Sequence, residues 1–232
     1  MFNAQRRASA SWNASAIVAA ALGLVALLLL AGCSGSTVKG SFDAYSWSEL
    51  SAIAAEIHDA SSDEEGIAIA ESYHLISGGK PDGKTKSVTL SDATKATVAI
   101  AGVRQDDLAS GGKAGLTLVF TSAPATHAMN SEPTNDGGWE KSEMRSWLND
   151  EFIDMLPADL KGVIVAASKK TNSSAFTSPG AVSSTSDKLW LLSLVEVSGS
   201  VSANSLFGAN GSGIPAATYD KEGKQYQDRK SV

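Results

Sequence analysis

The hydrophobic pattern of the chain begins with one long apolar run and continues as short amphipathic segments. Residues 16–30 contain only apolar residues and one glycine, and Arg6 and Arg7 precede them. A run of about 15 apolar residues behind a basic start is typical of a secretory signal peptide and is short for a permanent membrane helix, which needs about 20 residues. We therefore expect residues 1–32 to be a signal peptide.

The first amphipathic segments predict a pair of helices over residues 45–76. Ser46 and Glu49 have the spacing of a capping box, and apolar residues follow them at helical intervals as far as about residue 59. The same spacing recurs at the start of residues 62–74, which form a shorter periodic segment. These two segments predict a helical hairpin.

Further along the chain, β-branched residues with partial alternation predict strands, with one longer amphipathic helix between two groups of them. The predicted strands are residues 87–90, 97–103, 116–120, 163–167 and 189–197. Residues 140–155 have helical spacing, and Pro157 suits the start of a short helical turn. Polar loops are expected over 122–138 and 171–186. Because strands and helices do not alternate regularly, the pattern predicts an α+β fold with a mainly antiparallel sheet.

The predicted organisation has five parts. They are a signal peptide over 1–32, a lipidated tether over 33–44, the helical pair over 45–76, an α+β domain over 77–215 and a polar tail over 216–232. The signal holds two arginines and no acids, so the remaining 200 residues carry 17 basic and 25 acidic residues, a formal net charge of −8. Nucleic acid calls for clustered basic residues, so we expect no nucleic acid partner.

Cys33 is the only cysteine of the chain and directly follows the apolar run. The sequence Leu30-Ala31-Gly32-Cys33 resembles the lipobox of bacterial lipoproteins, in which the thiol is acylated and cleavage makes the cysteine the new N-terminus. We therefore expect Cys33 to carry a lipid with palmitate-type acyl chains, and the protein to be anchored on the extracytoplasmic face of the cell membrane. The alternative is an uncleaved membrane helix with an incidental cysteine.

Residues 78–85, Gly-Gly-Lys-Pro-Asp-Gly-Lys-Thr, fit the phosphate-loop pattern G-x-x-x-x-G-K-[ST]. That loop binds phosphate at the start of a helix, whereas residues 86–90 alternate like a strand. Pro81 also lacks a backbone N–H that a phosphate cradle would use. A hairpin-type turn is the preferred interpretation, and no nucleotide is expected.

The sequence contains no recognised catalytic or metal-binding motif. The three histidines lack the spacing of a metal site, and no serine lies in G-x-S-x-G. Asp106 and Asp107 are interpreted as solvated turn residues rather than as calcium ligands. We therefore expect no metal, no cofactor and no catalytic residues.

Two segments, residues 137–149 and 184–193, are the most distinctive of the chain. Trp139 follows two glycines and is the best candidate for an exposed aromatic side chain. Arg145 lies off the apolar side of its helix, where it can pair with an acid from the adjacent sheet. Trp139, Arg145 and Trp190 are the candidate ligand-binding residues, although packing in the core is the preferred interpretation of the tryptophans.

These segments contain the patterns W-E-x-S-x-M-R-x-W-L-N and T-x-D-K-L-W-L-L-S. Together with residues 45–50 and 103–108 they resemble a family of actinobacterial surface lipoproteins, the domain of unknown function 6273 family, over about residues 45–228. The resemblance implies surface display and a compact α+β unit similar to C-type-lectin-like folds, and it implies no established activity. Members of that family generally continue beyond the second pattern with further strands, so the resemblance also implies a shortened C-terminus.

The expected function is that of a membrane-anchored lipoprotein that binds an envelope glycan or another envelope protein. One alternative is an envelope hydrolase in which Arg145, Asp187 and His127 converge only in three dimensions. Another is an inactive, truncated copy.

Overall fold

A computed structural model describes residues 37–134, 136–172, 182–199 and 224–226, all of which belong to the second of two compact units of the chain, residues 37–232. The apolar run of residues 16–30 and the expected lipidation site, Cys33, lie outside the described residues. Within the described ranges, none of the helices has both the length and the apolar character that crossing a bilayer requires.

Capping side chains start the two N-terminal helices, which confirms the predicted helical pair. The elements are the short 3-10 helix η1 (Phe42–Ala44) and the helices α2 (Trp47–Asp59) and α3 (Asp63–Ser72). The Ser46 hydroxyl accepts from Glu49 N at 3.2 Å, and the Glu49 carboxylate accepts from Ser46 N at 2.7 Å. At α3 the reciprocal pair is incomplete, because Ser62 accepts from Glu65 N while the Glu65 carboxylate accepts from Ser61 N instead.

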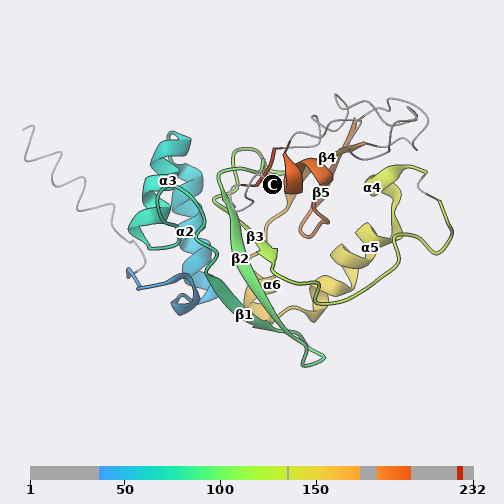
Figure 1. The fold of residues 1–232 in the computed structure, drawn as a ribbon, viewed down its shortest axis with the longest axis horizontal. Coiled ribbons are helices and arrows are strands. Elements are labelled where there is room, and N and C mark those ends of the chain that lie inside the picture. Colours follow the sequence, from blue (N-terminus) through green and yellow to red (C-terminus); the bar gives the residue numbers. More distant parts are fainter. Residues whose placement is uncertain (1–36, 135, 173–181, 200–223, 227–232) are drawn as a thin grey trace, which may run out of the picture. The chain divides into compact units, whose positions relative to one another are not determined.

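A three-stranded antiparallel sheet follows, in the spatial order β1-β2-β3, and confirms the first three predicted strands. Its strands are β1 (Thr85–Thr89), β2 (Lys95–Val103) and β3 (Leu116–Phe120). In Figure 1 the α2–α3 pair lies on one side of this sheet, and α4, α5 and the β4–β5 pair lie on the other. The hydrophobic core takes side chains from the helices and from the sheet, among them Phe42, Tyr45, Ile53, Ile57, Ile100, Val103 and Phe152.

The glycine-rich residues 78–85 form a turn that leads into a strand. Ser77 and Lys80 exchange backbone hydrogen bonds of 2.9 and 3.3 Å across this turn. Gly78 and Gly79 have φ values of +60° and +76°, which a glycine adopts without strain. Because β1 begins at Thr85 and no helix follows, the hairpin-type interpretation is confirmed.

The predicted helix over residues 140–155 is divided into three pieces. They are α4 (Gly138–Lys141), α5 (Glu143–Asp150) and the 3-10 helix η2 (Phe152–Met155). Ser142 has an extended ψ of 142° and its hydroxyl accepts from Arg145 N at 3.2 Å. It therefore ends one helix and caps the next, a competition for backbone groups that is typical of serine. The short helix expected after it is α6 (Ala158–Lys161), with Pro157 at the N-cap position.

The last two predicted strands are wrong. Residues 163–166 are irregular, and the second sheet consists of β4 (Ala167–Asn172) and β5 (Val182–Asp187), which pair antiparallel. The residues of the expected loop 171–186 that the structure describes, 171–172 and 182–186, are therefore all in strands. Residues 189–193 are irregular and lead into the helix α7 (Leu194–Ser198), because Ser193 and Glu196 form a complete capping box at its start.

The described part of the expected polar tail is a three-residue segment, 224–226, and it does not behave as a tail. Tyr226 is 1% exposed, and its backbone N–H donates to the carbonyl of Glu196 at 3.0 Å. Gln105 Nε2 donates to the carbonyls of Lys224 and Gln225 at 3.0 Å each. The segment is therefore hydrogen-bonded to two separate parts of the domain, at Glu196 and at Gln105.

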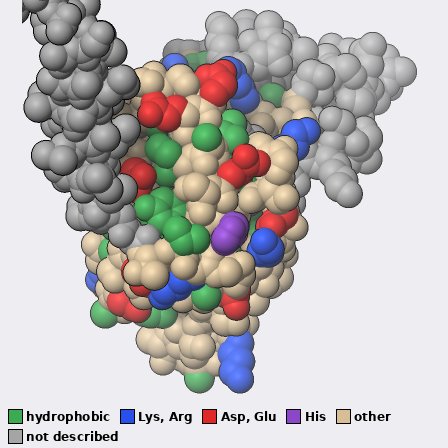
Figure 2. Space-filling view, turned by 90° about the vertical axis from the view of Figure 1, so that its left-hand side faces the viewer, with side chains coloured by type: hydrophobic (Ala, Val, Ile, Leu, Met, Phe, Trp, Pro, Cys, Tyr) green, Lys and Arg blue, Asp and Glu red, His purple; other side chains and the backbone are tan. Residues whose placement is uncertain are grey.

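Charged side chains are mixed on the face that Figure 2 shows, which includes α2 and α3. Acidic groups are spread over this face with basic groups between them, and apolar side chains gather in a small area beside them. This interspersed pattern is that of an ordinary solvated surface.

Candidate functional site

Two of the three candidate ligand-binding residues meet at one carboxylate. Trp139 on α4 donates from Nε1 to Asp187 Oδ2 at 2.8 Å, and Arg145 on α5 donates from Nε to Asp187 Oδ1 at 2.7 Å. Asp187 is the last residue of β5, so Arg145 has the acidic partner from a sheet that its position on the helix predicts. We call Trp139, Arg145, Thr185 and Asp187 the Arg145 site.

Local sequence positions both donors. Gly137 and Gly138 have φ values of +83° and +56°, a left-handed conformation that a Cβ atom disfavours, and they turn the chain into α4. The helix break at Ser142 then starts α5 in a new direction. These two local features bring Trp139 and Arg145 to the same carboxylate although they lie on separate helices.

The carboxylate of Asp187 is buried and accepts hydrogen bonds from three side chains. Its side chain is 0% exposed, and Thr185 Oγ1 donates to Oδ2 at 2.6 Å in addition to the two donors on α4 and α5. A buried charge is tolerated in a protein when it is paired and hydrogen-bonded. The role of Asp187 in this site is therefore to position Arg145 and Trp139.

Asn149 fixes the turn that follows Asp187. Its Oδ1 accepts from the backbone N–H groups of Lys188 at 2.8 Å and Leu189 at 3.2 Å, and its Nδ2 donates to the Leu189 carbonyl at 2.9 Å. Sequence reasoning overlooked Asn149 and Thr185, although each lies in one of the two distinctive segments. The available signal was that Asn149 is a polar residue near the end of a helix, where its amide can bind backbone groups.

The guanidinium of Arg145 can donate further hydrogen bonds. Its terminal nitrogens donate only long, weak hydrogen bonds, of 3.4 Å each, to the carbonyls of Glu140 and Ser186. The Arg145 side chain is 28% exposed, and that of Trp139 is half-buried. A guanidinium has five N–H donors, and its planar edge fits a carboxylate or phosphate with two parallel hydrogen bonds. The arrangement can therefore hold an anionic group at a partly exposed position.

Trp190, the third candidate, contacts a different cation. The Nζ of Lys169 on β4 lies 4.6 Å from the centroid of the Trp190 ring, a cation–π geometry. Trp190 is half-buried. The structure therefore places it at a second polar cluster and not among the partners of Asp187.

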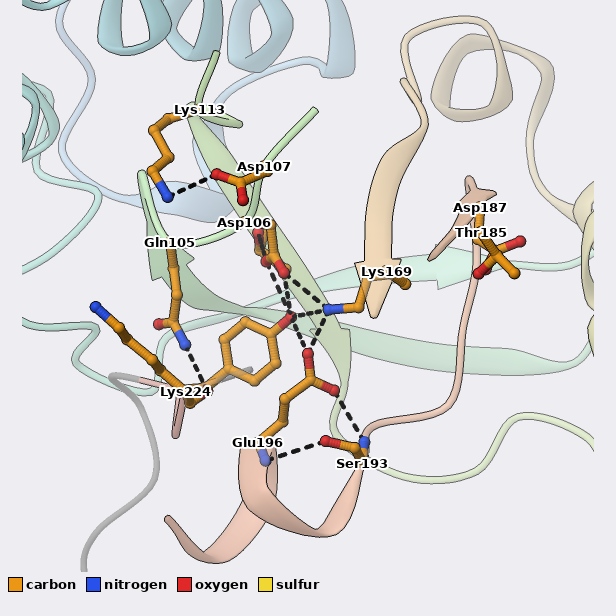
Figure 3. A network of polar contacts seen from close by, with 12 residues as sticks. Gln105, Asp106, Asp107, Lys113, Lys169, Thr185, Asp187, Ser193, Glu196 and Lys224 are labelled. Carbon is orange, nitrogen blue, oxygen red and sulfur yellow. Dashed lines mark hydrogen bonds and ion pairs between the residues drawn. The ribbon is translucent and has the colours of Figure 1, made fainter. Parts of the chain in front are cut away.

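We call this second cluster the buried ion cluster; its members are Asp106, Lys169, Glu196 and Tyr226. Lys169 Nζ lies 2.9 Å from Asp106 Oδ1 and also contacts Glu196 Oε1, and Figure 3 shows it pointing between the two carboxylates. Tyr226 Oη donates to both oxygens of Asp106, at 3.0 and 2.9 Å. Burial, together with the charges of Asp106 and Glu196, raises the pKa of Tyr226. In Figure 3 Asp187 lies apart from this cluster.

The buried ion cluster corrects the interpretation of Asp106 as a solvated turn residue. Asp106 is 8% exposed and also accepts from Thr117 Oγ1 at 2.6 Å. Its neighbour Asp107 is exposed and pairs with Lys113 at 2.7 Å, as a surface turn residue does. Sequence reasoning missed the cluster because its members are far apart along the chain and no spacing relates them.

Of the three residues of the hydrolase alternative, the structure brings Arg145 and Asp187 together and gives His127 other contacts. Arg145 pairs with Asp187, whereas His127 stacks on Trp147 with ring centroids 4.7 Å apart. The Nδ1 atom of His127 lies 2.7 Å from the carbonyl of Ala128. Among the residues that the structure describes, no three His, Cys, Asp or Glu side chains are grouped as metal ligands.

Comparison with known proteins gives one family. No curated protein and no solved structure matches the chain. The family described as Domain of unknown function (DUF6273) matches residues 114–232, more than half of the sequence. The matched part contains the whole Arg145 site and three members of the buried ion cluster, and Asp106 lies outside it. The chain therefore belongs to the family of the domain of unknown function DUF6273.

Proposed function

We propose that this protein is a lipid-anchored extracytoplasmic binding protein that holds an acidic group of an envelope glycan at the Arg145 site. The observation that carries the proposal is the state of the Arg145 guanidinium. Asp187 fixes it through Nε at 2.7 Å, while its two terminal nitrogens have only carbonyl contacts of 3.4 Å. A cation that is oriented in advance binds an anion with little further loss of side-chain freedom.

The chemistry of the site suits a carboxylate or phosphate attached to a sugar. The guanidinium edge supplies two parallel donors for the acidic group. Trp139 is held beside it by the shared carboxylate and is half-buried, so part of its aromatic surface can pack against the apolar face of a sugar ring. Neutral glycans would lack the charge-assisted part of this interaction.

Binding fits this geometry better than catalysis. A general base needs a carboxylate or imidazole that reaches the proton of a substrate. Asp187 is fully buried and accepts from three side-chain donors, and His127 stacks on another aromatic ring. The polar groups of the site are thus engaged in holding Arg145 and Trp139 in place.

The proposed location rests on the lipobox-like sequence that ends at Cys33, and we attribute a bacterial lipoprotein origin to the protein on the same sequence. The lipid would place the domain next to the envelope polymers that it binds. Metabolic labelling with a fatty acid tests the anchor. We expect label on the wild-type chain and none on Cys33→Ala, and an unlabelled wild-type chain would refute the anchor.

A direct binding experiment compares oligosaccharides of uronic acids with neutral hexose oligosaccharides of the same length. The full-length chain in detergent is titrated with each by calorimetry. We expect binding of the uronic acid oligosaccharides only, and at least tenfold weaker binding by Arg145→Lys, because lysine lacks the planar double donor and one charge-assisted hydrogen bond contributes about 1.5–3 kcal/mol.

Lys95→Gln is the control for net charge. Lys95 is an exposed residue at the start of β2, and its replacement removes one positive charge, whereas Arg145→Lys removes none. We expect unchanged affinity for Lys95→Gln. Equal binding of acidic and neutral oligosaccharides, or equal affinity of the wild type and Arg145→Lys, would refute the proposal.

A further inference from the structure

The buried ion cluster brings one amine and two carboxyl groups into direct contact in the interior. Lys169 Nζ lies 2.9 Å from an oxygen of Asp106 and contacts an oxygen of Glu196. The three residues are 5%, 8% and 3% exposed. Water therefore competes little for these groups, and a single cation faces two carboxylates. Such a group of reactive side chains lies outside the Arg145 site and has no part in the proposed binding.

We propose that Lys169 and Asp106 condense to an intramolecular isopeptide bond that joins β4 to the segment after β2. The Nζ atom forms a bond to Cγ of Asp106, one Cγ–O bond of the carboxyl group breaks, and the oxygen leaves as water. The ammonium and the carboxylate together contain every atom of the amide and the water. The reaction therefore needs no oxidant, reductant or activating co-reactant.

Glu196 is placed to move the protons of this reaction. Transfer of one proton from the ammonium to Asp106 gives a neutral amine and a carboxylic acid. When Nζ has added to Cγ, Glu196 Oε1, which contacts Nζ, takes a second proton from the nitrogen and delivers it to the departing hydroxyl. Ser193 N donates to Glu196 Oε2 at 2.9 Å and holds the carboxylate in position.

The hydrogen-bond donors identify Asp106 as the carboxyl group that is attacked. Thr117 Oγ1 donates to it at 2.6 Å, and Tyr226 Oη donates to both of its oxygens at 3.0 and 2.9 Å. Donors at these oxygens stabilise the negative charge that develops on them during attack. The contact of Tyr226 Oη with Glu196 is longer, at 3.4 Å. The raised pKa of Tyr226 keeps its hydroxyl protonated and able to donate.

Peptide mass spectrometry of the wild-type chain tests the bond. Trypsin cleaves after unmodified lysine, and it does not cleave after Lys169 when its amine is acylated. The full-length chain is therefore expected to yield a branched peptide in which residues 105–113 are joined to residues 162–170, one water lighter than the two together. Fragmentation is expected to place the link on Asp106 and not on Asp107. Recovery of 105–113 and 162–169 only as linear peptides would overturn the proposal.

Three variants separate the bond from its surroundings. Lys169→Arg keeps the positive charge but has no amine that forms this amide, so it is expected to release peptide 105–113 in linear form. Lys170→Arg changes the exposed neighbour on β4 and is expected to keep the branched peptide. Glu196→Gln is expected to lose the branched peptide while circular dichroism shows a folded chain. An unchanged yield of the branched peptide in Glu196→Gln would refute proton transfer by Glu196.

Discussion

Arg145→Met isolates the energetic role of the pair between Arg145 and Asp187. The substitution removes the cation and keeps much of the apolar volume of the side chain, while Asp187 retains its contacts with Trp139 and Thr185. Removal of one partner from a buried ion pair costs about 3–5 kcal/mol, because the remaining charge stays in the interior. Arg145 is 28% exposed, so solvent already screens part of the interaction. We therefore expect a loss of about 2–4 kcal/mol in the free energy of unfolding.

Urea denaturation followed by tryptophan fluorescence measures this loss. With a denaturant dependence of about 2 kcal/mol per molar urea, the midpoint is expected to fall by about 1–2 M. The double variant Arg145→Met/Asp187→Asn is expected to recover at least half of the loss, because it no longer contains an unpaired buried charge. A midpoint shift below about 0.3 M for Arg145→Met would refute the reasoning, since changes of about 0.5 kcal/mol are ordinary for surface substitutions.

Three further predictions concern the N-terminal half of the domain. Ser46→Ala removes the cap of α2 and is expected to lower the free energy of unfolding by about 1 kcal/mol in the same urea assay. Hydrogen bonds from Lys39 and from the backbone of Ser46 lower the pKa of Glu49 to about 2. This folded-state pKa lies below the ordinary value of 4.5, so the ionised carboxylate of Glu49 stabilises the folded chain. That stabilisation is complete above pH 4.5 and is lost as the pH falls toward 2. Glu49→Gln should therefore reduce the acid sensitivity of unfolding in that range, and an unchanged pH profile would contradict this. A methyl group at Gly115 would lie 1.9 Å from a backbone oxygen of α2, so Gly115→Ala is expected to lower the free energy of unfolding by about 3 kcal/mol. The matched control Gly40→Ala, whose methyl group would meet no atom within 4 Å, is expected to leave the urea midpoint unchanged.

The N-terminal half of the fold was predictable because its signals are local. The capping spacing of Ser46 and Glu49 directly precedes the apolar periodicity of α2, and both features lie within one helix. The strands β1, β2 and β3 contain β-branched residues in partial alternation, and a short polar turn and a glycine-rich loop connect them. In each case the residues that determine the element are close together in the sequence.

The second sheet was missed because its strands are polar. The sequence of β4 is Ala-Ser-Lys-Lys-Thr-Asn and that of β5 is Val-Ser-Ser-Thr-Ser-Asp, and neither shows an apolar alternation. Their buried side chains include the polar residues Lys169, Thr185 and Asp187, which form ion pairs and hydrogen bonds. The apolar residues after β5 instead lead to a helix, for which the capping pair Ser193 and Glu196 was a readable signal.

The candidate site was predictable only in part. The position of Arg145 off the apolar side of its helix predicts an acidic partner, and the structure supplies Asp187. The buried ion cluster has no comparable signal, because Asp106 and Tyr226 are 120 residues apart and each is an ordinary residue type in its own segment. Tertiary packing alone brings them together.

The distance in sequence between Asp106 and Tyr226 also sets an order of events during synthesis. A ribosome adds about 5–20 residues per second, so the tyrosine is made roughly 6–24 seconds after the aspartate. The helical hairpin and the first sheet depend on nearby residues and can form within that interval. The hydrogen bonds between Asp106 and the Tyr226 hydroxyl can form only once residue 226 has been made. Closure of the buried ion cluster thus depends on a residue near the end of the chain, so a chain that stops before Tyr226 leaves Asp106 without this donor.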